Sequence, residues 1–534
     1  ERGPQNLNDQ SFWVSVNDLK AYANAFYGLI PGGVSVLDDT DSDIQVPNNI
    51  NSFLWGQYVV PTEGGVWQKS NWQNIRNINY FMTHYQSVQA AEADVNIYVA
   101  EMRFFRALEY FNKIQLLGDV PWLEVDLNVD SEELYGPKMK RNQVFQKIIE
   151  DLDFAIQWLP EAGSEEANRL NKDIARHVKA RFCLNEGTHY KYHNELEYAS
   201  EAEKWLQMAA TESDKLITSG RYEIYNTGHP QEDYFNMYRI DDKSDLKEAV
   251  LYVDYKTDIR EHNMAAAGRE AGCGFSKSFV ESFLCSDGLP ISLSNKYLGD
   301  ETMRKETANR DPRLKQLILT NDFPTNVTDD LKDSTFVVNE DEFITQHCFT
   351  GYRPIKGFNP IYSQALYMKS SFDGIAYRYA ETLLINAEAK AELNTITDAD
   401  LDRTINQLRD RVGMPHLTVN VGFTDPKWPD WGYSLSPILQ EIRRERCIEL
   451  AGEGFRFNDL KRWKAGKVLN NVLTYVGKRK PDGNLAIVYP NYTNPDLSYQ
   501  AGKSRTWEDK MYLYPIPTGE LQRNPQLLPQ NPGW

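Results

Sequence analysis

Cysteine is scarce in this sequence, and basic residues are outnumbered by acidic ones. The 534 residues include only five widely scattered cysteines: Cys183, Cys273, Cys285, Cys348 and Cys447. This odd number, without a Cys-x-x-Cys pair, argues against a disulfide framework or a cysteine-based zinc site, and we expect free thiols. Lys and Arg number 58 against 76 Asp and Glu, which gives a net charge of −18. Because neutralising phosphates requires clustered Lys and Arg, these numbers also argue against a nucleic-acid partner.

Long apolar runs and catalytic motifs are also missing. No stretch approaches the roughly 20 apolar residues of a membrane-spanning helix. The chain opens at Glu1 without Met or a signal peptide, so we expect it to have been processed or trimmed. No Ser-His-Asp order, phosphate loop or complete metal-ligand set stands out, which favours a non-catalytic protein without a cofactor. Aromatic residues, in contrast, are plentiful: 12 Trp, 30 Tyr and 23 Phe can fill a core and leave rings for binding.

The stretch Ser436–Gly466 predicts two helices joined by a turn. Ser436 is a suitable N-cap and the proline after it suits the first helical position. Gly452 and Gly454 can end this helix, and Asn458 or Asp459 can cap a second one.

Charged side chains on the first of these helices fall among apolar ones. Arg446 and Glu449 share a helix face with leucines and isoleucines, where charges persist only if they are paired or hydrogen-bonded. The spacing of Glu445, Glu449 and Glu453 also permits a glycosidase interpretation, since paired carboxylates hydrolyse glycosidic bonds. However, carboxylates one turn apart point the same way and cannot flank a bond, so we favour a structural ion-pair network.

Helical periodicity covers much of the chain. Helix pairs are predicted near 72–117, 141–190 and 377–412, whereas Glu248–Lys256 reads as a strand. The stretch 257–376 is long, rich in Gly and polar residues, and weakly periodic. Irregular segments of this length inside a compact protein are usually functional or disordered.

An acidic segment, Asp38–Ile50, imitates the start of a calcium-binding loop. An EF-hand requires Gly at the sixth position and Glu at the twelfth, but this segment has Ile44 and Ile50 there. We therefore predict a solvated loop without a metal ion.

Several motifs resemble those of the SusD/RagB family. They occur in order along essentially the whole chain: NRDPRL (309–314), RYAETLLINAEA (378–389), IRRERCIELAGEGFRFNDLKRW (442–463) and the closing YLYPIPTGELQRNPQLLPQNPGW (512–534). The resemblance is weakest in 257–375, where ligand identity would be encoded.

The resemblance implies a mainly α, single SusD-like domain over residues 1–534. Tetratricopeptide-like helix pairs would occupy about 72–219 and 377–466. A loop-rich part with a few short strands, about 38–70 and 250–375, would face the ligand.

The resemblance also implies a function. Family members are outer-membrane lipoproteins that capture glycans at the bacterial cell surface and work with a SusC-like TonB-dependent transporter. Their lipid is attached to a Cys after the signal peptide, and no Cys lies near this N-terminus, so we expect the anchor to be absent from this chain. A peptide-binding, RagB-like subunit of a peptide importer is the nearest alternative. A glycoside hydrolase and a helical-repeat scaffold are the others.

Aromatic and imidazole side chains in the irregular segments are the predicted ligand contacts, because flat rings can cover the C–H faces of sugars. They are Trp55, Tyr58 and Trp67 in the early loop, and Tyr255, His262 and Tyr297 in the later region. Trp67 is the first choice, since two glycines precede it closely and a helix begins just beyond. The alternative is that Trp67 covers the core over Trp72, which is itself predicted to be a packing residue.

Overall fold

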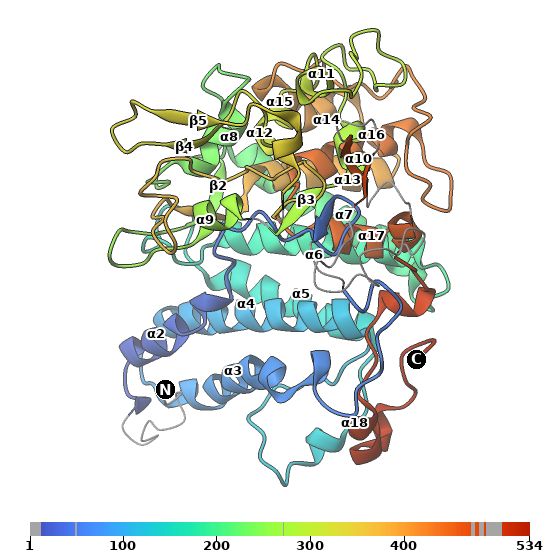
Figure 1. Ribbon diagram of the computed structural model, residues 1–534. Helices are drawn as coiled ribbons and strands as arrows, with labels where there is room; N and C mark the ends of the chain where they lie inside the picture. Colours follow the sequence, from blue (N-terminus) through green and yellow to red (C-terminus); the bar gives the residue numbers. More distant parts are fainter. Residues whose placement is uncertain are drawn as a thin grey trace. The chain divides into compact units, whose positions relative to one another are not determined.

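The computed structural model describes residues 12–47, 51–270, 272–345, 347–470, 476–479, 485–487 and 505–534. Two compact units are distinguished. Unit 1 comprises Glu1–Pro31, Val59–Phe182 and Asp509–Trp534, and unit 2 comprises Gly32–Tyr58 and Cys183–Glu508. Helices dominate the described part of the chain, and each strand within it belongs to a two-stranded sheet (Figure 1). The predicted fold class, mainly α with a few short strands, is confirmed.

Unit 1 is helical in its described residues. Its α-helices are α2 (Val16–Asn24), α3 (Gln73–His84), α4 (Glu92–Leu117), α5 (Arg141–Trp158) and α18 (Thr518–Arg523). The boundary between the units, after Phe182, falls within α6 (Lys172–Tyr192). The described residues of unit 1 also form short 3-10 segments: η2 (Tyr27–Leu29), η3 (Gly65–Trp67), η4 (Lys69–Trp72), η5 (Tyr85–Ser87), η6 (Glu132–Tyr135), η12 (Asp509–Tyr512) and η13 (Pro525–Leu527).

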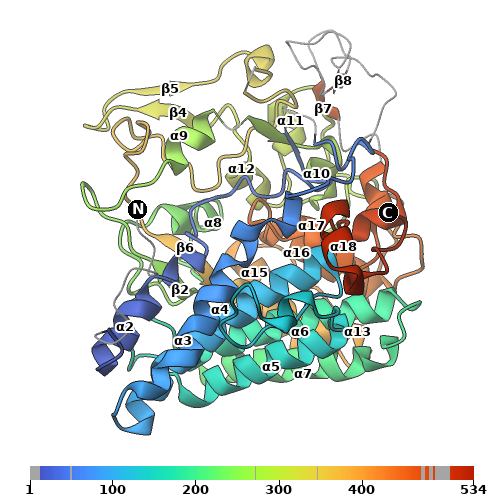
Figure 2. The ribbon, with the colours of Figure 1, turned by 90° about the horizontal axis from the view of Figure 1, so that it is seen from below.

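Helix α4 is the longest element of unit 1, at 26 residues. Val99, Met102 and Phe105 recur every three or four residues and are buried, as the core-facing side of an amphipathic helix requires. Helix α5 lies alongside α4 (Figures 1 and 2). The Arg106 guanidinium of α4 donates to both carboxylate oxygens of Asp151 on α5, each at 2.7 Å. A two-pronged, buried pair of this kind fixes the register of the two helices.

Unit 2 combines longer helices with many short elements. The longer helices are α7 (Ala202–Ser219), α13 (Tyr379–Glu392) and α16 (Pro437–Glu449). The shorter ones are α8 (Asp233–Asn236), α9 (Met264–Arg269), α10 (Lys277–Ser282), α11 (Met303–Thr307), α12 (Arg313–Leu317), α14 (Asp398–Asp402), α15 (Ile405–Arg411) and α17 (Arg456–Arg462). In the described residues of unit 2 they are accompanied by the 3-10 segments η7 (Ala199–Glu201), η8 (Met237–Arg239), η9 (Glu340–Phe343) and η10 (Gly466–Asn470).

The strands of unit 2 form antiparallel pairs. They are β1 (Gln45–Pro47) with β3 (Cys273–Phe275), β2 (Ala249–Val253) with β6 (Gly374–Arg378), β4 (Pro324–Val327) with β5 (Ser334–Phe336), and β7 (Val476–Arg479) with β8 (Leu485–Ile487). In the second pair Leu251 lies opposite Tyr377. The predicted strand Glu248–Lys256 is therefore present as β2, and its partner β6 leads directly into α13.

An ionic cluster lies in the interior of unit 2, where α16 packs against α13 (Figure 2). Glu449 is completely buried, and its carboxylate accepts hydrogen bonds from Arg313, Arg378 and Arg411 at 2.6–3.1 Å. Burial by itself would raise the pKa of Glu449, but the three guanidiniums hold that pKa well below its ordinary value. This carboxylate therefore stays ionised and fully paired.

Neighbouring charges on α16, and Glu453 just after it, are paired in the same way. The Arg446 Nε donates to Asp459 at 2.8 Å, Glu445 accepts from Arg409 at 3.1 Å, and Glu453 accepts from the Lys356 ammonium at 2.5 Å. The five cysteines are free thiols. The predicted structural network is confirmed, and the pairing explains why Glu445 and Glu449 tolerate burial on one helix.

The acidic segment around Asp39 differs from the prediction. Asp39 is completely buried, and its two carboxylate oxygens accept the backbone N–H groups of Gly452 at 2.7 Å and Arg456 at 2.9 Å. The Arg456 guanidinium donates to both carboxylate oxygens of Asp43, at 2.7 and 2.9 Å. The prediction of a solvated loop is wrong, because Asp39 caps the start of α17 and Asp43 neutralises its first arginine. The predicted caps, Asn458 and Asp459, lie inside α17 instead.

Candidate functional site

The six predicted ligand-contacting side chains are distributed over both units. Trp67 belongs to unit 1. The remaining five belong to unit 2: Trp55, Tyr58, Tyr255, His262 and Tyr297. Two of the six are buried and four are half-buried. Each therefore has a structural partner that its position in a loop did not reveal.

Trp55 and His262 were expected to present exposed rings, and this expectation is wrong. Trp55 is 9% exposed, with the Arg505 guanidinium 5.3 Å from its ring centroid. The His262 Nε2 lies 2.9 Å from the Phe372 carbonyl, and its Nδ1 accepts the Met264 backbone N–H at 3.2 Å. Burial lowers the pKa of His262 to about 4. A neutral imidazole with both nitrogens occupied joins two backbone segments, and it has no nitrogen left for a ligand.

Tyr255 and Tyr297 are half-buried beneath arginines. The Arg260 guanidinium lies 4.6 Å from the Tyr255 ring centroid, and the Arg310 guanidinium lies 5.4 Å from that of Tyr297. Tyr58 is half-buried too, with its ring packed edge-on to Phe53 at 5.4 Å. In Tyr255 and Tyr297 the arginine covers one face of the ring, so a ligand could contact only the other face. A role for these three residues in ligand binding stays a prediction.

Trp67 lies at the end of η3, which follows two glycines. Gly64 and Gly65 adopt positive φ angles of 84° and 58°, a turn that favours glycine. The Trp67 ring centroid is 5.2 Å from that of Trp72, at an interplanar angle of 60°, and both rings are half-buried. The anchored position expected for Trp67 and the contact with Trp72 expected in the alternative are therefore both present.

Two tyrosines that were not predicted as contacts are far more exposed. Tyr362 is 50% exposed and Tyr367 is 78% exposed, in an irregular part of unit 2. The side chains of Leu366 and Met368 beside them, and of Ile259, are exposed as well. The available signal was IYSQALYM (361–368), an aromatic segment inside a region already expected to face a ligand.

Backbone hydrogen bonds hold these tyrosines in place. His262 and Ser370 exchange backbone hydrogen bonds of 2.9 and 3.1 Å, and the Met368 N–H donates to the Asn263 side chain at 2.9 Å. The Tyr362 N–H donates to the Val327 carbonyl on β4 at 2.9 Å. The side chains therefore project from segments with a fixed course, which lowers the entropy lost when a ring engages a ligand.

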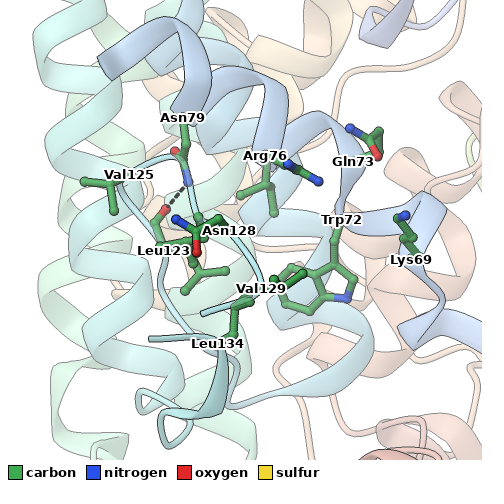
Figure 3. A pocket seen from close by; sticks show the side chains of 12 residues that line it. Lys69, Trp72, Gln73, Arg76, Asn79, Leu123, Val125, Asn128, Val129 and Leu134 are labelled. Atoms are coloured by element: carbon green, nitrogen blue, oxygen red, sulfur yellow. Dashed lines mark hydrogen bonds between the residues drawn. The ribbon is translucent and has the colours of Figure 1, made fainter. Parts of the chain in front are cut away.

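Unit 1 contains a pocket of about 220 Å³ (Figure 3). One wall comes from η4 and α3, where Lys69, Trp72, Gln73, Ile75, Arg76 and Asn79 share a face. The other wall comes from the segment after α4 and from η6: Leu123, Val125, Leu127, Asn128, Val129 and Leu134. Figure 3 shows the Trp72 ring beside Val129 and Leu134. Trp72 was predicted only as a packing residue, and the structure shows that it also lines this pocket.

A second pocket, of about 350 Å³, lies in unit 2. Polar residues such as Asn309, Arg310 and Asp311 line much of it. The Arg310 guanidinium is buried and donates to the backbone carbonyls of Glu306, Val280 and Phe283. Its N–H groups therefore brace the surrounding loops, and the same side chain supports Tyr297.

Membrane-spanning helices and clusters of metal ligands are absent from the described residues. Among them, no helix combines the length and apolar character needed to cross a bilayer. The described residues also include no group of three His, Cys, Asp or Glu side chains placed to hold a metal ion.

Comparisons with known proteins agree on one family. The curated SusD-like protein P2 from Formosa agariphila is 23% identical over 561 residues, which cover 99% of this chain and 94% of the relative. A solved SusD-like protein from Bacteroides fragilis superposes with a TM-score of 0.76 at 23% identity, with both chains fully covered. A SusD-like carbohydrate binding protein from the same organism has a TM-score of 0.72 at 20% identity and covers 97% of this chain and 100% of its own.

The sequence model of the SusD family matches residues 215–534, which is more than half of the chain. This region contains the α16–α17 hairpin with its buried ionic cluster, the RYAE segment at the start of α13, and the Pro-rich C-terminus. These are the motifs on which the resemblance rests. The chain therefore belongs to the SusD family.

Proposed function

We propose that this protein is a non-catalytic glycan-binding subunit of a nutrient uptake system at the bacterial cell surface. Membership of the SusD family supports the proposal. So does the likeness to a solved SusD-like protein described as carbohydrate binding. The polysaccharide or oligosaccharide would be bound without cleavage and passed to a SusC-like TonB-dependent transporter. A lipid anchor in the outer membrane would hold the protein at the surface.

The exposed tyrosines of unit 2 are the observation that carries this proposal. Tyr367 and Tyr362 expose 78% and 50% of their surface on backbone fixed by hydrogen bonds. Together with the exposed Leu366 and Met368 they form a local apolar cluster, and clusters of this kind often mark a binding surface. A tyrosine ring covers the C–H face of a sugar, loses only two side-chain torsions, and keeps a hydroxyl for hydrogen bonding.

Of the half-buried residues predicted as ligand contacts, Tyr255 lies near the segment that carries the two exposed tyrosines. Tyr255 is near the same segments, since its ring packs edge-on at 4.7 Å from His262, which pairs with Ser370. We keep Tyr255, Tyr58, Tyr297 and Trp67 as candidate contacts. Trp55 and His262 are left out because they are buried.

Alanine variants of the two tyrosines test this function. Tyr362→Ala and Tyr367→Ala should each weaken binding to a neutral polysaccharide by about 1–3 kcal/mol, by analogy with aromatic stacking on nucleobases. Affinity electrophoresis with starch, laminarin, xylan and mannan would measure the effect. Tyr135→Ala is the matched control, since Tyr135 is 51% exposed in unit 1. Unchanged binding in the double variant would remove these rings from the site, and binding of peptides alone would favour a peptide importer.

A further inference from the structure

Two basic side chains, Lys69 and Arg76, line the pocket between α3 and the segment after α4. In the described part of the chain, Lys69 has no hydrogen-bond or ion-pair partner. The Arg76 Nε approaches Asp126 Oδ1 only to 3.7 Å, which is too long for a hydrogen bond, and the Arg76 side chain is 48% exposed. Figure 3 shows Lys69 and Arg76 on the same wall as Trp72. Arg76 therefore has one acidic neighbour at ion-pair distance, Asp126, whereas Lys69 has none among the described residues.

A buried acceptor on the pocket wall also lacks a partner. Asn79 is 1% exposed, and its side-chain N–H donates to the Leu123 carbonyl at 2.8 Å, as drawn in Figure 3. The Asn79 Oδ1 is buried without a hydrogen bond from any described residue. Buried acceptors normally have a donor, and a ligand hydroxyl in the pocket would supply one here.

The remaining surface of the pocket is apolar and reaches the solvent. Val129 is 81% exposed, Val125 is 50% exposed and Leu134 is 44% exposed, opposite the Trp72 ring. A body with flat C–H faces fits between an indole and aliphatic side chains. At about 220 Å³ the space suits one monosaccharide rather than a longer segment of polymer.

We propose that this pocket binds one anionic sugar residue, a uronate or a sulfated sugar, within a longer glycan. The sugar ring would lie against Trp72, a hydroxyl would donate to Asn79 Oδ1, and the acidic group would pair with Arg76 while Lys69 adds a second positive charge. Guanidinium groups suit carboxylates and sulfates because their planar N–H groups donate in parallel. The proposal rests on the proposed glycan-binding function and adds the chemical class of the ligand.

Calorimetry with three probes of matched length tests this site: oligogalacturonides, the same oligosaccharides after reduction of their carboxyl groups, and sulfated galactan oligosaccharides. The wild-type protein should bind at least one anionic probe, and the carboxyl-reduced probe should bind about tenfold more weakly than its parent, as expected on loss of a charge-assisted hydrogen bond. Arg76→Gln and Lys69→Gln should lower anionic affinity by a similar factor. Lys332→Gln is the control, because the Lys332 side chain is 78% exposed in unit 2.

Three results would overturn the assignment: no binding of any anionic probe, equal affinity for the acidic and carboxyl-reduced probes, or unchanged anionic affinity in Arg76→Gln and Lys69→Gln. Binding of a fatty acid or an acidic peptide without an anionic sugar would overturn it as well. Neutral polysaccharides measured in parallel separate this inference from the proposed function. If they bind while the anionic probes fail, only the pocket assignment is lost, whereas absence of all glycan binding removes both.

Discussion

Replacing Glu449 by alanine tests whether the charged residues of α16 stabilise the fold or bind the ligand. The Glu449 side chain is completely buried and accepts hydrogen bonds from three buried arginines: Arg313, Arg378 and Arg411. Glu449→Ala deletes the carboxylate and leaves these guanidiniums with fewer acceptors. Among the described residues, the carboxylate that Arg411 still contacts is Glu248, at 3.5 Å.

The expected loss of stability is large. Removing one partner of a buried ion pair typically costs about 3–5 kcal/mol, because a buried charge is left uncompensated. The contact geometry here places Glu449→Ala at the upper part of that range, since two short Arg411 bonds of 2.6 and 2.8 Å are lost together. The lowered pKa of Glu449 also predicts a pH effect. A depressed carboxyl pKa stabilises the fold above the ordinary value of 4.5, and this contribution fades as the pH falls further.

Urea unfolding of the wild type, Glu449→Ala and Glu132→Ala would measure the difference. Glu132 is exposed on η6, so its removal should change the free energy of unfolding by less than about 0.5 kcal/mol. Glycan affinity of the folded Glu449→Ala fraction should stay at the wild-type value. A destabilisation below about 1 kcal/mol, or a loss of affinity at unchanged stability, would refute the structural interpretation.

Three further predictions concern Trp67, Asp39 and the partner. Trp67→Ala should lower glycan affinity by about 1–3 kcal/mol in calorimetry, and normal binding would exclude the ring from the site. Burial raises the pKa of Asp39 to about 7, so the fold favours the protonated form. Wild-type stability relative to Asp39→Asn should therefore fall as the pH rises from about 4 to 7 in urea unfolding, and a pH-independent difference would contradict this. Co-purification from detergent-solubilised outer membrane should recover a large β-barrel transporter, whereas recovery of this protein alone would count against the partnership.

Sequence reasoning predicted the features that periodicity and local chemistry specify. The face of α4 through Val99, Met102 and Phe105 follows from helical spacing alone. The burial of Glu449 follows from its place among leucines and isoleucines, because a buried carboxylate requires a cation. The identity of its partners does not follow. Arg313 and Arg378 lie 136 and 71 residues away in sequence, and only the tertiary fold brings them to α16.

Exposure in the irregular regions was the part that sequence could not predict. Trp55 and His262 have the same residue types and loop settings as exposed ligand contacts, yet Arg505 and the Phe372 carbonyl take up their surfaces. The buried acidic segment around Asp39 failed for the same reason, since its partner Arg456 lies over 400 residues further along the chain. Tyr367 is exposed on a segment whose course is fixed by hydrogen bonds to residues distant in sequence. No local sequence pattern encodes those bonds.

Binding of glycans without cleavage is the property that defines the proposed function. Calorimetric titration with a panel of neutral and anionic polysaccharides and of peptides, followed by chromatography of the same samples for new chain ends, tests it directly. Saturable binding of at least one glycan is expected, with its chain length unchanged after prolonged incubation. Shortened glycan chains, or binding confined to peptides, would contradict it.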